Sequence, residues 1–460
     1  MTPWWAGRGF DASHHERYIK VVGVGVEGES TMDVISQPRE WPASIRHLKV
    51  FDSVAQLHSV QRASEECYVS QPAVTQAIAK LEEQVGVALL QRCPRGTYLN
   101  EFGVIFHRRA RRFFEQLEQA LLELGVPVAP VPLPRVASRL SGAQLRSLIA
   151  IVETGSFAQA SCVLEVSQAS LQRAARDLQR TLRRPLLAQT ASGIVATPAA
   201  AEFVRRLKLA QREIKLGLDE VEAARGNDGG EIVIGAMRAA GGVMLASVID
   251  EFADSYPNAN IRMLTGTPQE MMRSLRCGDV DAVIGLLRDS ESGDLVQEPL
   301  GETPYVVVAR RYHPLVQQRR NITLDDLARY AWVIGTAAGG RRARFEKLFA
   351  GQRKPAARIE ASSLPTIRLL LAQSDRLTLL TSYELMCEED TLTSLPFGPI
   401  EPVPSFGLTM RENWLPTQRQ ASFIDLIRKR IARSLMPAKE TQRNGTSRFV
   451  RDETRAVAVS

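Results

Sequence analysis

The sequence predicts an α/β protein in which two successive helical units precede a larger domain of alternating strands and helices. Three observations support this prediction. A segment of the first half recurs at a fixed distance along the chain. Apolar residues in both copies follow helical spacing. Beyond Gly229 and Gly230 the pattern changes to buried strands separated by helices, which is typical of a parallel, doubly wound sheet.

The repeat is a shift of 97 residues that aligns two segments without a gap. We base it on the following residues of the first copy, each of which recurs 97 positions later: Ser59, Ala63, Ser64, Val69, Ser70, Gln71, Ala77, Leu81, Leu89, Leu90 and Gly96. A register held over this length indicates duplication of one structural unit.

The first copy is expected to form three helices and a turn-rich wing. Ser59 and Ser70 are placed to cap the second and third helices, and Pro72 falls in the first turn of the third, where its missing N–H costs nothing. The third helix would bury one stripe, which leaves polar and basic side chains on its other faces: Gln71, Ala73, Thr75, Gln76 and Lys80. Such side chains can reach base edges and phosphates, although solvated helix faces have the same composition.

The second copy repeats this pattern, with Ser167 opening its third helix. The exposed positions predicted for that helix are Gln168, Ser170, Gln172, Arg173 and Arg176. Between residues 139 and 225 there are 13 Lys or Arg against 8 Asp or Glu, so this copy holds much of the chain's basic excess. A basic surface suits a polyanionic partner.

Composition excludes several classes of protein. The chain has 460 residues, 44% of them apolar and 24% charged, with a formal net charge of +7, as in a soluble globular protein of several domains. The five cysteines are scattered and the histidines form no ligand pattern, so no metal site, cofactor or catalytic site is predicted. The absence of a long apolar run or a signal-like N-terminus predicts a cytoplasmic protein that does not enter the membrane.

The run from Val69 to Ile78, with Leu81, Gly86 and Arg95-Gly96 after it, resembles the winged helix-turn-helix of LysR-type transcriptional regulators. The resemblance covers about residues 45 to 124. It implies binding to double-stranded DNA, with Ser70, Gln71, Pro72, Ala73, Thr75 and Gln76 in the recognition helix and Arg92 and Arg95 at the wing.

The second copy resembles the same domain but diverges from it. Ala169 replaces the proline, Gln189 stands in the place of Arg92, and Arg183 in the place of Gly86. Family members usually carry one such domain, so the duplication is itself a departure. The second copy is expected to extend the operator, to contact the DNA backbone alone, or to act as a spacer or dimerisation unit.

A long helix is predicted after each wing, over residues 102–124 and 198–225. In the LysR family this linker helix forms the contact between two chains of a dimer. The alternative is a helix packed within its own chain. A Pro-rich connector between the copies is expected to be extended.

The C-terminal half resembles the LysR-type effector-binding domain, which is similar in fold to periplasmic solute-binding proteins and has two lobes. The matching runs include Phe252 to Pro257, Leu275 to Ile284 and His313-Pro-Leu. Parallel sheets bind ligands at the carboxyl ends of their strands, and hydroxyls near helix starts favour an anion such as a carboxylate. The effector contacts predicted by position are Arg238, Ala239, Thr265, Gly266, Thr267, Thr336, Ser362 and Ser363.

The predicted organisation has eight parts. These are a disordered extension (1–42), the first winged helix-turn-helix (43–103), its linker helix (104–124), the connector (125–138), the second winged helix-turn-helix (139–200), its linker helix (201–228), the effector domain (229–436) and a disordered tail (437–460). The expected partners are operator DNA, a small effector, RNA polymerase and further copies of the chain in a homodimer or homotetramer. The alternative is a cytoplasmic solute-binding or enzymatic protein whose helical repeats mediate protein contacts.

Overall fold

We analysed a computed structural model of the chain. It describes residues 20–23 and 43–435, apart from 127–135, 138, 191–192, 228, 238–241, 289–292, 319, 338 and 387. Most of the connector and the whole of the predicted tail lie outside the described residues. None of the helices in the described part combines the length and apolar character that a membrane span requires.

The chain divides into two compact units. The first contains the described residues up to Glu298 together with Ser362–Leu364 and Leu408–Ala421, and the second contains the rest. Helices and strands are both abundant, which confirms the predicted α/β class.

The first helical copy begins the first unit. Its elements are α1 (Ile45–Leu57), α2 (Val60–Cys67), α3 (Gln71–Val85) and a wing of two antiparallel strands, β2 (Leu90–Cys93) and β3 (Gly96–Leu99). The side chain of Ser59 caps α2 and that of Ser70 caps α3. The apolar stripe of α3 packs with Val50, Val54 and Ala63 into a small core.

The second copy repeats every element of the first at a distance of 97 residues. The elements are α6 (Gly142–Thr154), α7 (Phe157–Leu164), α8 (Gln168–Leu182), β4 (Leu187–Thr190) and β5 (Gly193–Ala196). The local bonds are repeated too. Oε1 of Glu82 accepts from the N–H groups of Leu89 and Leu90, and Oε1 of Gln179 accepts from those of Leu186 and Leu187. The sequence repeat is therefore a repeat of one fold.

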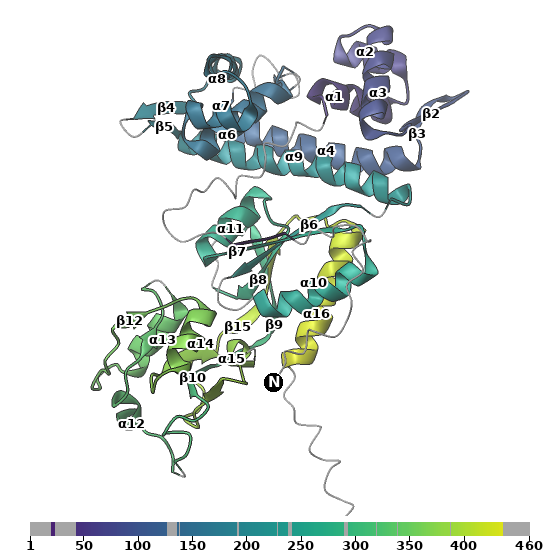
Figure 1. Ribbon diagram of the computed structural model, residues 1–460. Coiled ribbons are helices and arrows are strands. Elements are labelled where there is room, and N and C mark those ends of the chain that lie inside the picture. Colours follow the sequence, from purple (N-terminus) through teal and green to yellow (C-terminus); the bar gives the residue numbers. More distant parts are fainter. Residues whose placement is uncertain are drawn as a thin grey trace, which may run out of the picture. The chain divides into compact units, whose positions relative to one another are not determined.

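Each wing leads into a long helix, α4 (Glu101–Glu123) after the first copy and α9 (Pro198–Ala224) after the second. Asn100 and Thr197, again 97 residues apart, cap these helices. Figure 1 shows α4 and α9 side by side, with α1 to α3 over one end of the pair and α6 to α8 over the other.

The α/β part of the first unit is built on a six-stranded sheet with the strand order β1-β7-β6-β8-β15-β9. Its β6 runs parallel to both β7 and β8, as predicted for a doubly wound sheet. The elements here are β1 (Lys20–Gly23), β6 (Glu231–Met237), α10 (Gly242–Ser255), β7 (Asn260–Gly266), α11 (Pro268–Cys277), β8 (Ala282–Leu286), β9 (Leu295–Glu302) and β15 (Ser405–Arg411).

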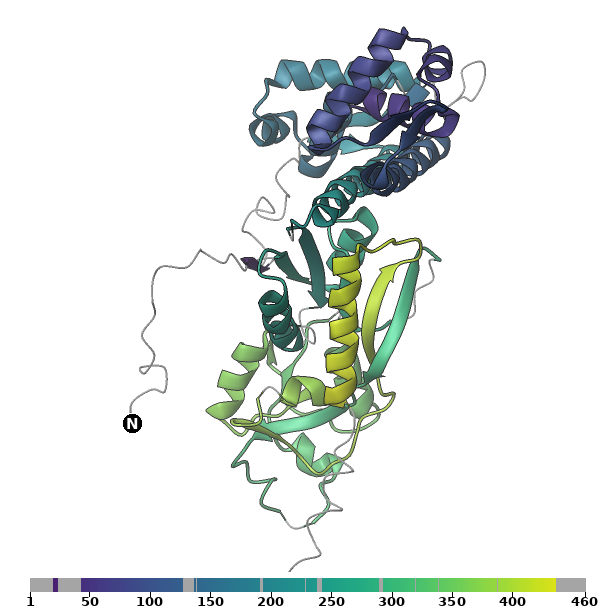
Figure 2. The same ribbon diagram turned by 90° about the vertical axis from the view of Figure 1, so that its right-hand side faces the viewer.

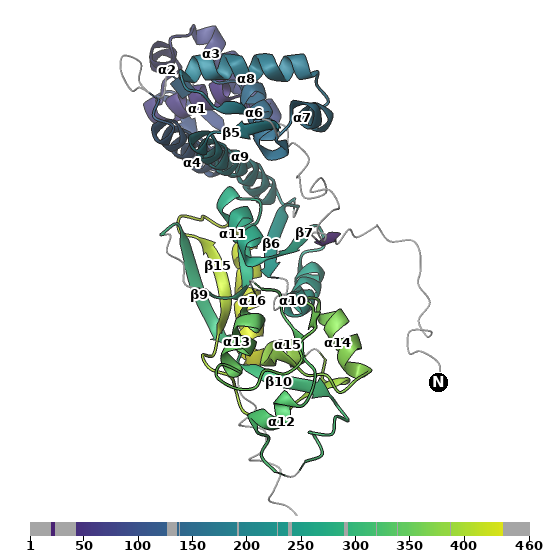
Figure 3. The same ribbon diagram turned by 90° about the vertical axis from the view of Figure 1, so that its left-hand side faces the viewer.

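Strand β1 corrects one expectation, because it lies in the extension for which the sequence predicted no regular structure. It pairs in parallel with β7 at the edge of the sheet, where Figures 2 and 3 show it as a short purple arrow. Without β1, strand β7 would be the edge strand and would present unpaired N–H and C=O groups on that side. The segment is too short for periodicity to reveal it.

The second unit contains a three-stranded sheet, in the order β13-β10-β14, and the parallel pair β11 and β12. Its elements are β10 (Tyr305–Arg310), α12 (Leu324–Ala328), β11 (Val333–Ile334), α13 (Gly340–Leu348), β12 (Ile359–Glu360), α14 (Leu364–Ala372), β13 (Thr378–Thr381), α15 (Ser382–Met386), β14 (Leu392–Ser394) and α16 (Gln418–Leu435). Gly339 is the N-cap residue of α13, and Gly340 is its first residue.

Candidate nucleic-acid interface

The outer face of α3 is open to solvent. Val74, Ile78 and Leu81 are buried, whereas most of the residues predicted to contact DNA are exposed. The exposed set comprises Ser70, Gln71, Pro72, Thr75, Gln76 and Lys80, and Ala73 is half-buried. The Ser70 hydroxyl accepts from the N–H of Ala73 at 3.4 Å. Ser70 therefore has a structural role in starting the helix, and the side chains after it are those available to a ligand.

The wing of the first copy is held against the end of α1. The N–H of Thr97 donates to the carbonyl oxygen of His58 at 3.0 Å. Gly96 has φ +141°, and a Cβ there would lie 2.4 Å from that oxygen, so only glycine fits. Arg92 and Arg95 are exposed beside this contact. The wing thus carries two cations at a fixed place next to α3.

The outer face of α8 is exposed like that of α3, but it carries more positively charged side chains. Every residue predicted from the second copy is exposed, namely Ser167, Gln168, Ser170, Gln172, Arg173 and Arg176. Arg180 near the end of α8 and Arg183 directly after the helix are exposed as well, and with Arg184 they line a hollow at the end of the helix. Ser167 caps α8 as Ser70 caps α3. The second face therefore offers a strongly cationic surface.

A buried carboxylate joins α1 to α4. Asp52 is 1% exposed, and its Oδ1 lies 3.0 Å from Nε2 of His107, while Lys49 donates to Oδ2 at 3.2 Å. Burial by itself raises the pKa of Asp52, but the hydrogen bonds from His107 and Lys49 and the charge of Arg111 outweigh it and hold the pKa below the ordinary 3.8. The ionised carboxylate is thus the form that holds the first copy onto its linker helix.

This cluster predicts a pH-dependent stability. Because the folded pKa of Asp52 is depressed, its contribution is complete above the unfolded value of 3.8 and disappears as the pH falls through the lower folded value. We expect Asp52→Asn to lower the free energy of unfolding by about 2 kcal/mol at neutral pH. The difference from the wild type should shrink below about pH 4. Urea unfolding at several pH values measures it, and a constant difference would contradict the assignment.

The helices α4 and α9 are joined by two arginine–carboxylate pairs. In one, Arg109 donates through Nε and Nη2 to the two carboxylate oxygens of Glu220, at 2.9 and 2.7 Å. In the other, Arg206 donates through the same two atoms to the carboxylate of Glu123. Arg206 is 97 residues after Arg109, and Glu220 is 97 residues after Glu123. The two pairs are therefore related by exchange of the two copies.

A third contact obeys the same exchange. Nη1 of Arg109 donates to Glu213 at 2.9 Å, and Nη1 of Arg206 donates to Gln116, the equivalent residue, at 3.3 Å. Residues early in one helix contact residues late in the other in both directions, so the helices are antiparallel. In a two-fold interface, if residue i of the first copy contacts residue j of the second, then residue j of the first copy contacts residue i of the second. The contacts between α4 and α9 follow this rule.

Apolar packing surrounds these pairs. One continuous core includes Phe106, Phe113 and Leu117 of α4 with Phe203 and Leu207 of α9. The helices approach closely at Gly217, where a Cβ would lie 3.0 Å from Cβ of Arg109. The two copies thus form one folded body rather than two units on a tether.

This packing corrects the expectation that each linker helix pairs with a second chain. The alternative, a helix packed within its own chain, is what the structure has. Sequence reasoning missed Arg109, Arg206, Glu123 and Glu220, although the signal was present. The shift of 97 residues that identified the repeat also relates these four, and comparing the charged positions of the two predicted linker helices would have found them.

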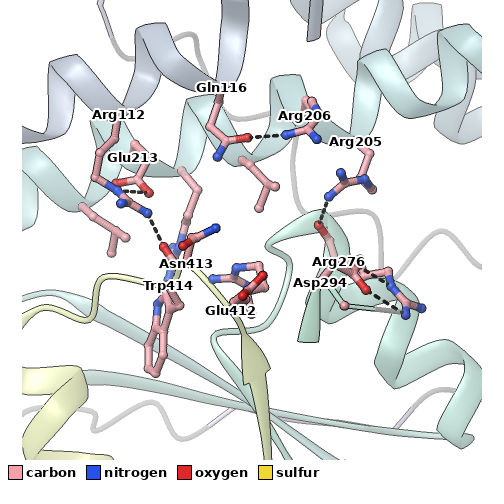
Figure 4. A pocket seen from close by; sticks show the side chains of 15 residues that line it. Arg112, Gln116, Arg205, Arg206, Glu213, Arg276, Asp294, Glu412, Asn413 and Trp414 are labelled. Carbon is pink, nitrogen blue, oxygen red and sulfur yellow. Dashed lines mark hydrogen bonds and ion pairs between the residues drawn. The ribbon is translucent and has the colours of Figure 1, made fainter. Parts of the chain in front are cut away.

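The linker pair also contacts the α/β part of the first unit. Arg212 of α9 is 5% exposed and donates to both oxygens of Asp281, at 2.9 and 3.0 Å. Oδ2 of Asp281 also accepts from the N–H of Val233 in β6. Beside them lies a pocket of about 320 Å³ lined by both linker helices and by residues 411–414 (Figure 4). There Arg112 bonds Glu213 and the carbonyl of Asn413, which joins α4 to this segment.

The predicted effector residues are spread over both units. Thr265 and Gly266 end β7, and Thr267 caps α11 in a reciprocal arrangement with Glu270. That capping already occupies the Thr267 hydroxyl. Thr336, Ser362 and Ser363 are exposed and lie before α13 or α14. Arg238 and Ala239 lie outside the described residues.

Two family models and several known proteins match this chain. The model described as the bacterial regulatory helix-turn-helix protein, lysR family, matches residues 45–104 and 143–201, and the model of the LysR substrate binding domain matches residues 225–432. The transcriptional regulator GalR of Pseudomonas putida is 29% identical over 395 residues, which cover 84% of this chain and 97% of that protein.

Two further matches are more distant or shorter. The probable transcriptional regulator LrrA of Synechococcus elongatus is 32% identical over 195 residues, covering 42% of this chain and 64% of that protein. Among solved structures, a variant of full-length OxyR from Pseudomonas aeruginosa is 19% identical, with a TM-score of 0.47, and covers 63% of this chain and 93% of its own.

Proposed function

Because the chain belongs to the LysR family of transcriptional regulators, it is a DNA-binding regulator with a C-terminal effector-binding domain, and we propose which residues carry out each task. We propose that α3 and α8 are recognition helices, that Arg92 and Arg95 contact the DNA backbone, and that the effector is a small anion. The observation that carries the proposal is that the polar faces of α3 and α8 are both exposed beside cationic side chains.

Two variants of the first copy separate base contacts from backbone contacts. We expect Gln71→Ala to reduce discrimination between operator sequences by about 1–3 kcal/mol, because the glutamine amide can accept from adenine N6 through its oxygen and donate to N7 through its nitrogen. We expect Arg95→Ala to weaken binding to all sequences. It should also reduce the slope of the logarithm of the binding constant against the logarithm of the salt concentration by about one. Gel-shift titrations on operator and unrelated duplexes at several salt concentrations measure both.

The two variants serve as controls for each other, since both side chains are exposed and neither change should unfold the protein. Equal losses on all sequences from both variants would contradict the separation of roles.

The double change Gln168→Ala with Arg173→Ala tests the second copy. An unchanged footprint length would mean that α8 does not touch DNA.

The proposed effector site of the first unit uses the carboxyl end of β7 and the exposed hydroxyls of Ser362 and Ser363. Thr336, in the second unit, stays a predicted contact. Hydroxyls and the N–H groups at helix starts bind anions, and Arg238 would add a charge-assisted contact. A panel of small carboxylates, each matched with its neutral amide, can be screened by thermal shift. Acids that raise the melting temperature where their amides do not support the proposal, and equal effects contradict an anionic effector.

We further propose that the protein acts in the cytoplasm, where its DNA partner lies, and that RNA polymerase is its partner at the promoter. Assembly into a homodimer or homotetramer would use surfaces other than the paired faces of α4 and α9. Sedimentation analysis of the full chain with and without operator DNA measures the assembly.

A further inference from the structure

We infer that a single chain is a complete DNA-binding unit with two heads, which are the winged helix-turn-helix of residues 45–99 and that of residues 142–196. The chain would then bind a composite operator with two unlike half-sites. This inference rests on the proposed function, because it assumes that α3 and α8 both face DNA. It differs from that proposal in saying that one chain supplies both heads in a fixed arrangement and that the heads prefer different sequences.

The fixed arrangement follows from the two-fold contacts between α4 and α9. Arg109 with Glu220 and Arg206 with Glu123 are equivalent pairs, and the continuous apolar core surrounds them. Figure 3 shows α3 and α8 on the same side of the linker pair. Proteins that bind two half-sites present two recognition helices related by a two-fold axis. Here the axis relates two parts of one chain.

The linker pairing leaves no need for a second chain at this interface. Phe106, Phe113 and Leu117 are fully buried, as are Phe203 and Leu207 on the opposite helix. The side chains that would bind another linker helix are therefore already covered. The duplication has replaced a contact between chains by a contact within one.

The two heads present different chemistry at equivalent positions. Gln71 and Gln168 are the same, but Gln76 corresponds to Arg173, Ala79 to Arg176, and Glu83 to Arg180, and all of these side chains are exposed. Glutamine suits adenine, whereas arginine bonds guanine through both N7 and O6. The half-site read by α8 should therefore be richer in guanine and should hold the protein more strongly through phosphates.

The first experiment selects binding sites for the full-length protein from a random duplex library. We expect a motif with two different half-elements, of which one is richer in guanine. A motif with two identical half-elements in inverted order would overturn the inference. Failure to select any motif would instead count against sequence-specific DNA binding, so the two failures can be told apart.

The second experiment asks whether the two heads must be on one chain. Gln76→Glu with Lys80→Glu places negative charge on α3, and Arg173→Glu with Arg176→Glu does so on α8; all four sites are exposed, so folding should be retained. Each variant should lose protection of one half-element only and bind the full motif at least about tenfold more weakly.

The variants are then mixed in equal amounts. If each chain carries both heads, the two variants occupy the two half-elements independently, and the mixture does not regain the wild-type affinity for the full motif. If two chains contribute one head each, as in a dimer through linker helices, the mixture regains a large part of the wild-type affinity for the full motif, and that result would overturn the inference.

Discussion

Arg109→Met is expected to destabilise the helical body by about 3–5 kcal/mol, the largest effect of any charge removal at the linker pair. Arg109 is 0% exposed, and its guanidinium bonds Glu213, Glu220 and the carbonyl of Leu415. Burial opposes its charge, but the two glutamates outweigh burial and raise its pKa. Methionine keeps most of the side-chain volume, so the loss measures the buried bonds from Arg109 to the two carboxylates, which keep Arg112 and Arg108 as more exposed donors. Urea unfolding and hydrogen exchange of the α4 and α9 amides measure it.

The repeat provides a matched control for this prediction. Arg206→Met removes the equivalent guanidinium from the equivalent carboxylate pair, but Arg206 and Glu123 are 20% and 30% exposed. Solvent screens such a pair, and we expect a loss of about 1 kcal/mol or less. Equal losses for the two variants would show that burial does not decide the strength of these pairs. The comparison is direct because the same two guanidinium atoms, Nε and Nη2, bond the carboxylate in both pairs.

Arg212→Met is expected to cost a similar amount, about 3–5 kcal/mol, at the junction between α9 and the sheet. Asp281 is 2% exposed, and without Arg212 its carboxylate would lose two hydrogen bonds and, among the described residues, keep the one from the N–H of Val233. Burial disfavours the charge on Arg212, but the attraction of Asp281 and Glu231 outweighs it and raises the pKa of Arg212. Hydrogen exchange of α9 and β6 amides, together with urea unfolding, reports the loss.

Arg262→Met is the control at this junction. Arg262 donates to Glu231 at 3.1 Å, so it shares that carboxylate with Arg212, but it is 26% exposed. A loss of about 1 kcal/mol or less is expected. A loss as large as that of Arg212→Met would mean that Glu231, and not Asp281, dominates the junction.

Local chemistry allowed much of this protein to be predicted from its sequence. Serines placed one residue before an apolar-periodic run predicted caps, and Ser59, Ser70, Ser156 and Ser167 all cap helices. Strand β1 could not be predicted, because four residues carry no detectable period and only the open edge of β7 makes them a strand. The effector residues were chosen by their place in the sequence after expected strands or before expected helices, and their roles remain predictions.

The sequence by itself determined the two copies, their helices and wings, and the fact that each linker helix has an apolar stripe that must be buried. It did not determine what buries that stripe, because a periodic pattern is the same whether the partner helix belongs to another chain or to the same one. Only the tertiary structure decided this, by bringing Arg109 to Glu220 and Arg206 to Glu123. The physical reason is that the apolar stripe of a helix depends on neighbouring residues in the sequence, whereas the surface that covers it depends on contacts between residues about a hundred positions apart.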